Sequence, residues 1–500
     1  MYIVNLASEL APVAKVGGLA DVLLGLSREL SWKGHDVDII IPKYDCMNSA
    51  EIRDLQIFHP DLMSFFEGGW YPNTIWMGWV ENLKVYFIEP HHPRYFFNRG
   101  CCYGCEDDID RFLYFTRTAL EFMFKRGFRP DIIHLHDWQT AVGAPLYKDM
   151  YVPLGLNSAK IVFTIHNIEY QGKCTKDNLD SIGMHGINYL VPNKLQDNQN
   201  DQSINLLKGG IVYSDFVTTV SPSYAREVQT PVQGKGLEKT LIQYSSKFTG
   251  ILNGVDYSYW NPEVDRYLPT QYSPREKPLD KKDHKTLDAK GFVKKYLREK
   301  LNMPEEHRPI IGCVCRLVPQ KGIELIKHAI KYSAENNAQF VLLGLCPIPS
   351  IAKEFHELKN SYADDQNINI TLHLQEDLSH IIFGGADMII VPSLFEPCGL
   401  TQLIALKYGT IPLVRKTGGL GDTIYDIDND VPAAHMGNGY VFEDPTNKAL
   451  ESALSRAFDC WFHHLEKWRK MMIDGMAVDF SWNVPSNKYL EIYNNLLQKL

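Results

Sequence analysis

A glycine pair beside a lysine near the start of the chain has the composition of an anion-binding loop. Residues 15–19 have the sequence Lys-Val-Gly-Gly-Leu and come directly before apolar residues at helical spacing. The main-chain amides of Gly17 and Gly18 at a helix N-terminus, together with the Lys15 ammonium, would attract a pyrophosphate. The Gly-Lys-Ser/Thr order of a Walker loop is absent. On these residues alone, a structural turn is an equally good interpretation.

A second cationic turn lies at residues 316–322, Arg-Leu-Val-Pro-Gln-Lys-Gly, between an apolar strand-like run and a helix-like run. Arg316 and Lys321 can together neutralise a diphosphate leaving group without a metal ion. This is electrostatic catalysis directed at charge that develops in the transition state. A basic turn that is merely solvated is the alternative.

A carboxylate stands in a similar position at residues 392–401, Pro-Ser-Leu-Phe-Glu-Pro-Cys-Gly-Leu-Thr, again between a strand and a helix. Glu396 beside the anomeric carbon of a sugar can stabilise positive charge in an oxocarbenium-like transition state. The amides from Gly399 onward can hold a phosphate, as at other helix N-termini. A glutamate near a helix N-terminus also has a purely structural use.

Histidines follow two apolar runs in the first half of the chain. Residues 134–138 have the sequence His-Leu-His-Asp-Trp, and residues 164–167 have the sequence Thr-Ile-His-Asn. Polar side chains at the carboxyl ends of parallel strands are well placed to form a binding site. A histidine that is satisfied by backbone partners in a turn is the alternative for His166, and more so for His136.

Metal-binding patterns are weak. The acidic segments at residues 108–110 and 426–430 are interpreted as solvated turns. The 10 cysteines are scattered, and the cluster at residues 101–105 has no second Cys or His pair at zinc-ligand spacing. We therefore expect reduced thiols and no metal site.

The elements that would position these residues are short β-rich runs that alternate with amphipathic helical runs, which is typical of βαβ units around a parallel sheet. Residues 15–19 have an echo at residues 416–420, Lys-Thr-Gly-Gly-Leu, which indicates either two nucleotide-domain halves or two steric glycine turns. Strands are predicted at residues 2–6, 37–41, 85–88, 131–135, 161–165, 216–220, 309–315, 340–343, 368–372, 388–391 and 411–414.

The predicted fold class is α/β, with two Rossmann-like domains facing across a cleft, because 500 residues exceed what one hydrophobic core supports. Ligands of such sheets bind beyond the carboxyl ends of the strands, so the cleft is the expected site. We expect domains at residues 1–261 and 309–478, a charged linker with at most one short helix at residues 262–308, and a C-terminal helix at residues 479–500. The tail carries an apolar stripe formed by Tyr489, Ile492, Tyr493, Leu496, Leu497 and Leu500.

Charge and hydropathy exclude some partners. The formal net charge of −9 opposes binding to nucleic acid. No apolar run approaches the roughly 20 residues of a membrane span. The first residues lack a basic segment and already have a strand pattern, so we expect no signal peptide and a cytoplasmic location.

Taken together, these segments resemble the glycogen and starch synthases of the bacterial and plant type, which are glycosyltransferases of the two-Rossmann-domain GT-B fold. The similarity spans nearly the whole chain, because residues 15–19, 136–138, 164–167, 251–256, 316–322 and 395–402 occur in family order. Residues 42–46, 89–93 and 253–262 look closest to the catalytic region of the third and fourth classes of plant soluble starch synthases. The long N-terminal extensions of those enzymes are absent, so we expect a bare catalytic core of bacterial type.

The resemblance implies a retaining transfer of glucose from a nucleotide-glucose, ADP-glucose, to the non-reducing 4-hydroxyl of an α-1,4-glucan, without a metal or other cofactor. It implies that Glu396 is the carboxylate of the cleft and that the backbone carbonyl of His166 lies near the anomeric carbon. Arg316 and Lys321 would neutralise the leaving group, and the tail helix would pack on the first domain. The other residues that it places at the site are Lys15, Gly17, Gly18, Asp21, Asp137, Asn167, Asn253, Cys398, Gly399, Leu400 and Thr401.

One position departs from the family pattern. The family has a Tyr-x-Glu-x-x-x-His segment whose tyrosine stacks on the nucleotide base, and here Leu374 occupies that place. The preference for the donor base, adenine or uracil, therefore stays open.

Other functions would leave different signatures. A catalytically silent glucan-binding or priming protein would have lost Lys15, Arg316, Lys321 or Glu396, and all four are present. Another transferase of the same fold with a small acceptor is a second alternative. A glucan phosphorylase would need a pyridoxal-phosphate lysine, and the sequence identifies none.

Overall fold

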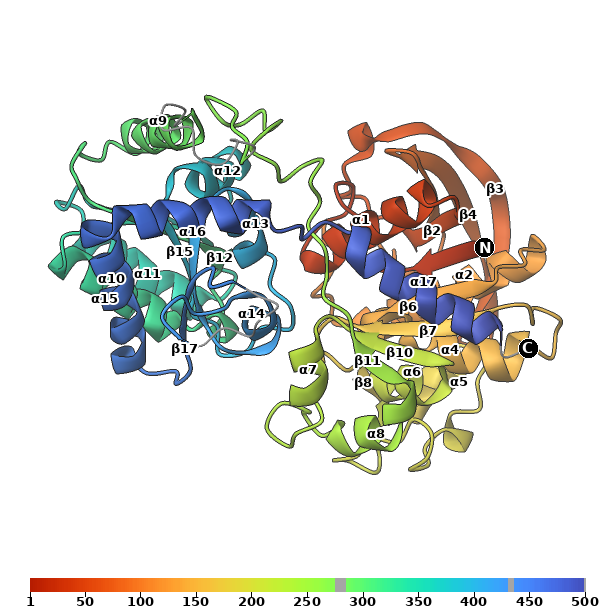
Figure 1. Cartoon of the computed structure of the whole chain (residues 1–500). Helices are drawn as coiled ribbons and strands as arrows, with labels where there is room; N and C mark the ends of the chain where they lie inside the picture. Colours follow the sequence, from red (N-terminus) through yellow and green to blue (C-terminus); the bar gives the residue numbers. More distant parts are fainter. Residues whose placement is uncertain (275–284, 430–435, 499–500) are drawn as a thin grey trace. The chain divides into compact units, whose positions relative to one another are not determined.

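The computed structural model describes residues 1–274, 285–429 and 436–498. The chain divides into two compact units, each with its own sheet (Figure 1). The first unit comprises Met1–Gly254 and Trp482–Leu500, and the second comprises Val255–Ser481. None of the helices in the described ranges combines the length and the apolar character that crossing a membrane requires.

The first unit is built on a nine-stranded sheet with the order β11-β10-β7-β6-β1-β2-β5-β4-β3. The strands from β11 to β5 pair in parallel, while β3 and β4 add an antiparallel hairpin at one edge. The strands are β1 (Tyr2–Leu6), β2 (Asp36–Pro42), β3 (Ile52–Phe66), β4 (Gly69–Val80), β5 (Leu83–Pro90), β6 (Ile132–His136), β7 (Lys160–Ile165), β10 (Phe216–Thr219) and β11 (Phe248–Gly250). The helices are α1 (Gly18–Trp32), α2 (Asp108–Lys125), α3 (Asp137–Ala141), α4 (Gly143–Leu146), α5 (Lys176–Ser181), α6 (Leu206–Tyr213), α7 (Pro222–Glu227), α8 (Glu238–Gln243) and α17 (Asn483–Leu497), and β8 (Lys173–Cys174) pairs with β9 (Ile204–Asn205).

The hairpin of β3 and β4 lies outside the predicted strands. Its register shifts at three places, between Arg53 and Gln56, between Ile57 and His59, and between His59 and Leu62. Such irregularities break the strict alternation of inward and outward side chains. Because β3 is also an edge strand with many exposed residues, its sequence lacks the apolar run of a buried parallel strand.

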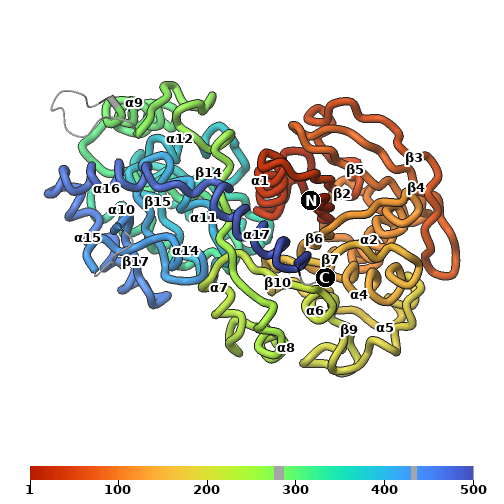
Figure 2. Tube along the Cα trace, turned by 45° about the vertical axis from the view of Figure 1, so that its right-hand side comes forward, coloured from red at the N-terminus to blue at the C-terminus, as the bar shows by residue number. Residues whose placement is uncertain are grey.

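The C-terminal helix α17 belongs to the first unit, where it lies beside α1 (Figure 1 and Figure 2). Tyr489 and Tyr493 are buried in one cluster with Leu26 of α1 and Ile3 of β1. The close approach explains a glycine in α1, because a Cβ on Gly25 would overlap the indole of Trp482. The last residue of the predicted apolar stripe, Leu500, lies outside the described residues.

The second unit contains a six-stranded, wholly parallel sheet with the order β14-β13-β12-β15-β16-β17. Every predicted strand overlaps an observed one, so the α/β class is confirmed in both units. The strands are β12 (Ile310–Arg316), β13 (Gln339–Leu345), β14 (Ile368–Thr371), β15 (Met388–Val391), β16 (Ile411–Arg415) and β17 (Tyr440–Phe442). The helices are α9 (Lys285–Lys300), α10 (Ile323–Glu335), α11 (Pro349–Ser361), α12 (Glu376–Gly385), α13 (Thr401–Lys407), α14 (Gly418–Thr423), α15 (Asn447–His463) and α16 (Leu465–Ala477).

The stretch at residues 262–308, expected as a linker with at most one short helix, is instead part of the second unit. It contains the 16-residue helix α9, which packs on α12. Val293 and Leu297 are four residues apart and fully buried, and Lys294 pairs with Asp387 at 2.7 Å. Lys290 and Arg298 are buried as well, so charged residues lie on both faces of α9 and obscure the short apolar strip that packs against α12.

Candidate active site

The glycine loop of the first unit is built around a buried carboxylate that spacing alone does not reveal. The amides of Val16 and Gly17 both donate to Glu9 Oε2 at 2.8 Å. The Tyr103 hydroxyl donates to Glu9 Oε1 at 2.7 Å. The Gly17 N–H, which was expected to attract a pyrophosphate, is therefore already bonded to Glu9. Gly18 begins α1, where the first N–H groups have no partner within the helix.

Lys15 stands near the first turn of α1. Its Nζ lies 2.7 Å from Asp21 Oδ1, and the two side chains are 42% and 27% exposed. An ion pair this exposed contributes only about 0–1 kcal/mol to stability. Lys15 can therefore exchange Asp21 for an anionic ligand at little energetic cost.

His134, His136 and His166 of the first unit form a buried, uncharged group. His136 Nδ1 lies 3.0 Å from His166 Nε2, and His136 Nε2 lies 3.3 Å from Asn5 Oδ1. Burial lowers the pKa of His166 to about 3, and burial with the neighbouring histidines lowers that of His136 well below its usual range. His134 is inside β6 and contacts the hydroxyl of Tyr493 at 2.8 Å. His134 and His136 are thus buried in β6 and contact side chains rather than the backbone of a turn, and His136 holds a neutral His166.

Asp137 holds the backbone of the turn after β7. It has a φ of 56°, in the left-handed region, and its Oδ1 accepts from the amides of His166 at 2.7 Å and Asn167 at 3.3 Å. Burial raises the pKa of this carboxyl to about 7 although the two amides oppose the shift, and the charge of Glu9 adds to it. The turn and the glycine loop therefore adjoin, and Asp137 fixes where the His166 carbonyl points.

The second unit brings a cation and a carboxylate together from segments 75 residues apart. Lys321 Nζ lies 2.6 Å from Glu396 Oε2, and the Ser393 hydroxyl donates to the same oxygen at 2.8 Å. Glu396 is only 7% exposed. Gly322 permits this approach, because its φ is 74° and a Cβ there would overlap the carbonyl oxygen of Pro392. The pair is therefore assembled by the packing of two loops.

Arg316 ends β12 and is exposed. Among the described residues it forms no ion pair. The charges of Arg316, Lys321 and Glu396 all shift the pKa of the neighbouring Cys315. These side chains therefore share one region at the carboxyl end of β12. The two predicted cations are thus brought together with the predicted carboxylate.

The loop that carries Glu396 is braced by the Gly-Gly pair of the sequence echo. The Gly419 amide donates to the carbonyl of Glu396 at 3.2 Å, and a Cβ on Gly418 would overlap that same oxygen. This contact makes the glycines at 418 and 419 part of the site, a role that their sequence alone leaves open. The rest of the loop consists of the buried Cys398, Gly399 with a φ of 76°, Leu400, and Thr401 at the start of α13.

Substituting Gly418 by Ala is expected to damage both stability and activity. The φ of 45° strains any other residue, and the new Cβ would push the Glu396 carbonyl away. The matched control is Gly34→Ala, at a φ of 86° with nothing within 4 Å of the new Cβ. We expect Gly418→Ala to lose at least about 1 kcal/mol more unfolding free energy than the control, measured by denaturant titration. Equal losses in the two variants would show that the contact with Glu396 is unimportant.

Leu374 and Asn253 have quite different surroundings. Leu374 is 78% exposed and lies just before α12. Asn253 is buried, and its Oδ1 has no hydrogen-bond partner among the described residues. A buried amide oxygen without a partner is costly, so a ligand or water donor would satisfy it.

The histidine of the segment that begins at Leu374 belongs to the core. His380 Nδ1 lies 2.7 Å from Asp265 Oδ2, and the ring stacks on Trp260 at 4.1 Å between centroids. Glu376 accepts a hydrogen bond from the Tyr259 hydroxyl. The exposed end of this segment is therefore held by a rigid aromatic cluster.

The acidic segments are occupied by arginines. No cluster of His, Cys, Asp or Glu side chains within the described ranges has a metal-binding arrangement. Cys101 and Cys105 have sulfurs 3.6 Å apart, and all ten cysteines are free thiols. Asp430, in the second acidic segment, lies outside the described residues. The pairs are Asp108 with Arg111, Asp110 with Arg94, and Asp426 with Arg456.

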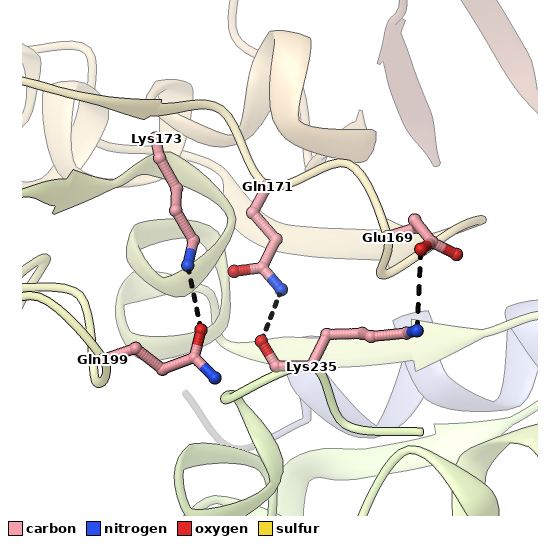
Figure 3. Close-up of a pocket in the computed structure, with 5 residues that line it drawn as sticks. All are labelled: Glu169, Gln171, Lys173, Gln199 and Lys235. Carbon is pink, nitrogen blue, oxygen red and sulfur yellow. Dashed lines mark hydrogen bonds and ion pairs between the residues drawn. The ribbon is translucent and has the colours of Figure 1, made fainter. Parts of the chain in front are cut away.

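A polar hollow of about 300 Å³ lies just beyond the His166 turn. It is lined by the five side chains in Figure 3, of which Lys173 lies in β8 and the others come from the loops after Asn167, before α6 and before α8. Gln171 Nε2 donates to the Lys235 carbonyl at 3.1 Å, and Lys173 Nζ donates to Gln199 Oε1 at 3.3 Å. Amide, ammonium and carboxylate groups of this kind bind hydroxyl-bearing ligands. None of the sequence motifs described above contains the residues that line this hollow.

The two Rossmann-like units, with a glycine loop at a helix start in one and a paired cation and carboxylate in the other, have the architecture of a glycosyltransferase of the GT-B fold. Family models agree, since "Starch synthase catalytic domain" matches residues 2–243 and "Glycosyl transferases group 1" matches residues 294–474. The chain belongs to the family of glycogen and starch synthases.

Two curated relatives and one solved structure establish this membership. The glycogen synthase of Protochlamydia amoebophila is 65% identical over 499 residues, which cover 100% of both chains. The probable starch synthase 4 of Arabidopsis thaliana is 46% identical over 100% of this chain and 47% of its own length. The catalytic domain of starch synthase IV from Arabidopsis, solved with ADP and acarbose, superposes with a TM-score of 0.95 at 46% identity over 99% of each chain.

Proposed function

We propose that the protein is a glycogen synthase that transfers glucose from ADP-glucose to the non-reducing 4-hydroxyl of an α-1,4-glucan, with retention at the anomeric carbon. The observation that carries the proposal is the ion pair between the half-buried Lys321 and the buried Glu396, whose loop contacts the glycines at 418 and 419. The cation suits a departing diphosphate, and the carboxylate suits an oxocarbenium-like centre. The glycogen synthase name of a full-length relative at 65% identity supports the same activity.

The residue roles follow from the family pattern and fit the local chemistry. Arg316 and Lys321 neutralise the leaving diphosphate, and the amides of Gly399, Leu400 and Thr401 bind it. The His166 carbonyl, oriented by Asp137, faces the anomeric centre. In the first unit, Lys15 and Gly18 meet the donor diphosphate, and Gly17, Asp21, Asn167 and Asn253 add further contacts, while Cys398 and Leu374 contribute from the second unit.

Parallel assays of labelled glucose incorporation into glycogen from ADP-glucose and from UDP-glucose test the activity. Incorporation that depends on both donor and glycogen is expected. Hydrolysis of the donor without growth of the glucan would refute the proposal. We place the activity in the cytoplasm, which the ten unpaired cysteines support.

Activity should not depend on a divalent metal ion. Arg316 and Lys321 supply the charge that Mg²⁺ provides in other transferases, and arginines already occupy the acidic segments. Excess EDTA is expected to leave the initial rate unchanged. A complete loss that Mg²⁺ or Mn²⁺ restores would give a metal the role assigned to the two cations.

Position 374 should influence the choice of donor base. Leucine gives a base apolar contact but no ring stacking. Stacking of a base on an aromatic ring is worth roughly 1–3 kcal/mol. Adenine has a larger stacking face than uracil, so ADP-glucose loses more binding energy than UDP-glucose when the ring is absent. The wild-type enzyme should therefore use UDP-glucose measurably. Leu374→Tyr should raise the ratio of kcat/KM for ADP-glucose over UDP-glucose. If wild type rejects UDP-glucose and the variant shows the same ratio, residue 374 does not read the base.

A further inference from the structure

Two thiols lie on one face of β12, immediately before Arg316. The sulfurs of Cys313 and Cys315 are 3.9 Å apart. Cys315 is half-buried and Cys313 is buried. The register partner of Cys315 on β13 is Gly344, and the Leu317 side chain fills the place that a side chain at position 344 would take.

The surroundings of Cys315 favour its thiolate. The contact with Cys313 and the charges of Lys321 and Arg316 favour a negative sulfur, so the pKa of Cys315 lies below its usual value despite burial and the opposing charge of Glu396. Thiolate character and partial exposure are the two properties that make a cysteine react with oxidants. Cys346, also half-buried, has a pKa raised by burial and by Cys315.

We propose that Cys315 is a peroxide-sensitive thiol and that its oxidation, completed by Cys313, switches off donor use at the adjoining cations. The switch rests on the proposed role of Arg316 and Lys321 at the donor diphosphate. The thiol chemistry itself does not depend on that role.

The oxidation balances with hydrogen peroxide as the oxidant. The Cys315 thiolate attacks one peroxide oxygen, so that an S–O bond forms, the O–O bond breaks, and the departing hydroxide takes a proton to become water. The Cys313 sulfur then attacks Cys315, forms the S–S bond and expels the second oxygen as water. Two thiols lose two electrons and two protons, and one peroxide becomes two waters.

Closing this bond must distort the end of β12. The sulfurs have to move from 3.9 Å to about 2.05 Å. Residues two apart in a strand have Cα atoms about 6.6–6.8 Å apart, at the upper limit of about 6.8 Å for a disulfide. Most disulfides have Cα atoms about 5.5–6 Å apart, so the strand would contract beside Arg316 and displace the guanidinium from the position that the donor requires.

The test treats the reduced full-length enzyme with hydrogen peroxide and measures both glucan synthesis and the mass of the tryptic peptide ending at Arg316. Wild type should lose most of its activity and regain it with dithiothreitol, and its peptide should lose the mass of two hydrogen atoms. Cys315→Ser should keep its activity under peroxide. The matched control Cys346→Ser, at a half-buried cysteine, should be inactivated like wild type.

Two results would overturn the switch. One is equal inactivation of Cys315→Ser and wild type, and the other is a fully active enzyme in which the peptide mass shows the 313–315 bridge. The reduced Lys321→Ala variant tests the role of the cations separately, because it involves no oxidation. Normal donor use in that variant would reject the proposed role, whereas the peptide mass reports on the thiols alone.

Discussion

Glu396→Gln should lower the turnover number by about a hundredfold or more while the protein stays folded. Glutamine keeps the shape of the side chain and can still accept from Ser393. It carries no charge, so positive charge at the anomeric carbon in the transition state is left uncompensated. The measurement is kcat with saturating donor and glycogen, together with a thermal unfolding curve.

The matched control for this substitution is Glu354→Gln. Glu354 also pairs with a lysine, Lys327, but its side chain is 48% exposed on the surface of the second unit. The control should have the turnover of wild type. A folded Glu396→Gln enzyme with near-native turnover would remove Glu396 from the mechanism.

Lys321→Ala should reduce kcat/KM for the donor by a comparable factor, about a hundredfold or more. The substitution deletes a cation expected at the diphosphate, and it also leaves the buried Glu396 without its ion-pair partner. Arg316→Ala should also reduce kcat/KM for the donor. Because Arg316 is exposed, this effect should come only from the lost charge at the diphosphate.

Lys327→Ala provides the control for charge, because it removes a surface lysine from the same unit. Steady-state kinetics with varied ADP-glucose measure the effect in each variant. Donor kinetics like those of wild type in Lys321→Ala would reject its role at the leaving group.

The strands that carry the site were predictable because a parallel sheet is buried on both faces. Residues 310–316 and 388–391 are nearly continuous apolar runs, and each is followed by a polar or glycine-containing turn. Arg316, Lys321 and Glu396 could therefore be located at strand ends. The ion pair between Lys321 and Glu396 could not be predicted, because it depends on how two loops 75 residues apart in the sequence pack together.

Other parts of the site have no comparable signal. Glu9 is a single acid upstream of the glycine loop, and only the fold shows that it occupies the amide of Gly17. The sequence shows the glycines at 418 and 419 as a repeat of the earlier Gly-Gly pair. Only the structure explains why glycine is needed there, which is a backbone contact with the Glu396 loop. The helix α9 could not be recognised for a different reason, because Lys290 and Arg298 are charged and yet buried, so its polar and apolar residues do not separate into two faces.

The central claim is tested most directly by following one reaction mixture by proton NMR, with ADP-glucose as donor and a maltooligosaccharide as acceptor. We expect ADP to appear in step with new α-1,4 linkages at the non-reducing end, with the α configuration of the donor retained. A β-linked product, or free glucose released without chain growth, would contradict the assignment of a retaining glucan synthase.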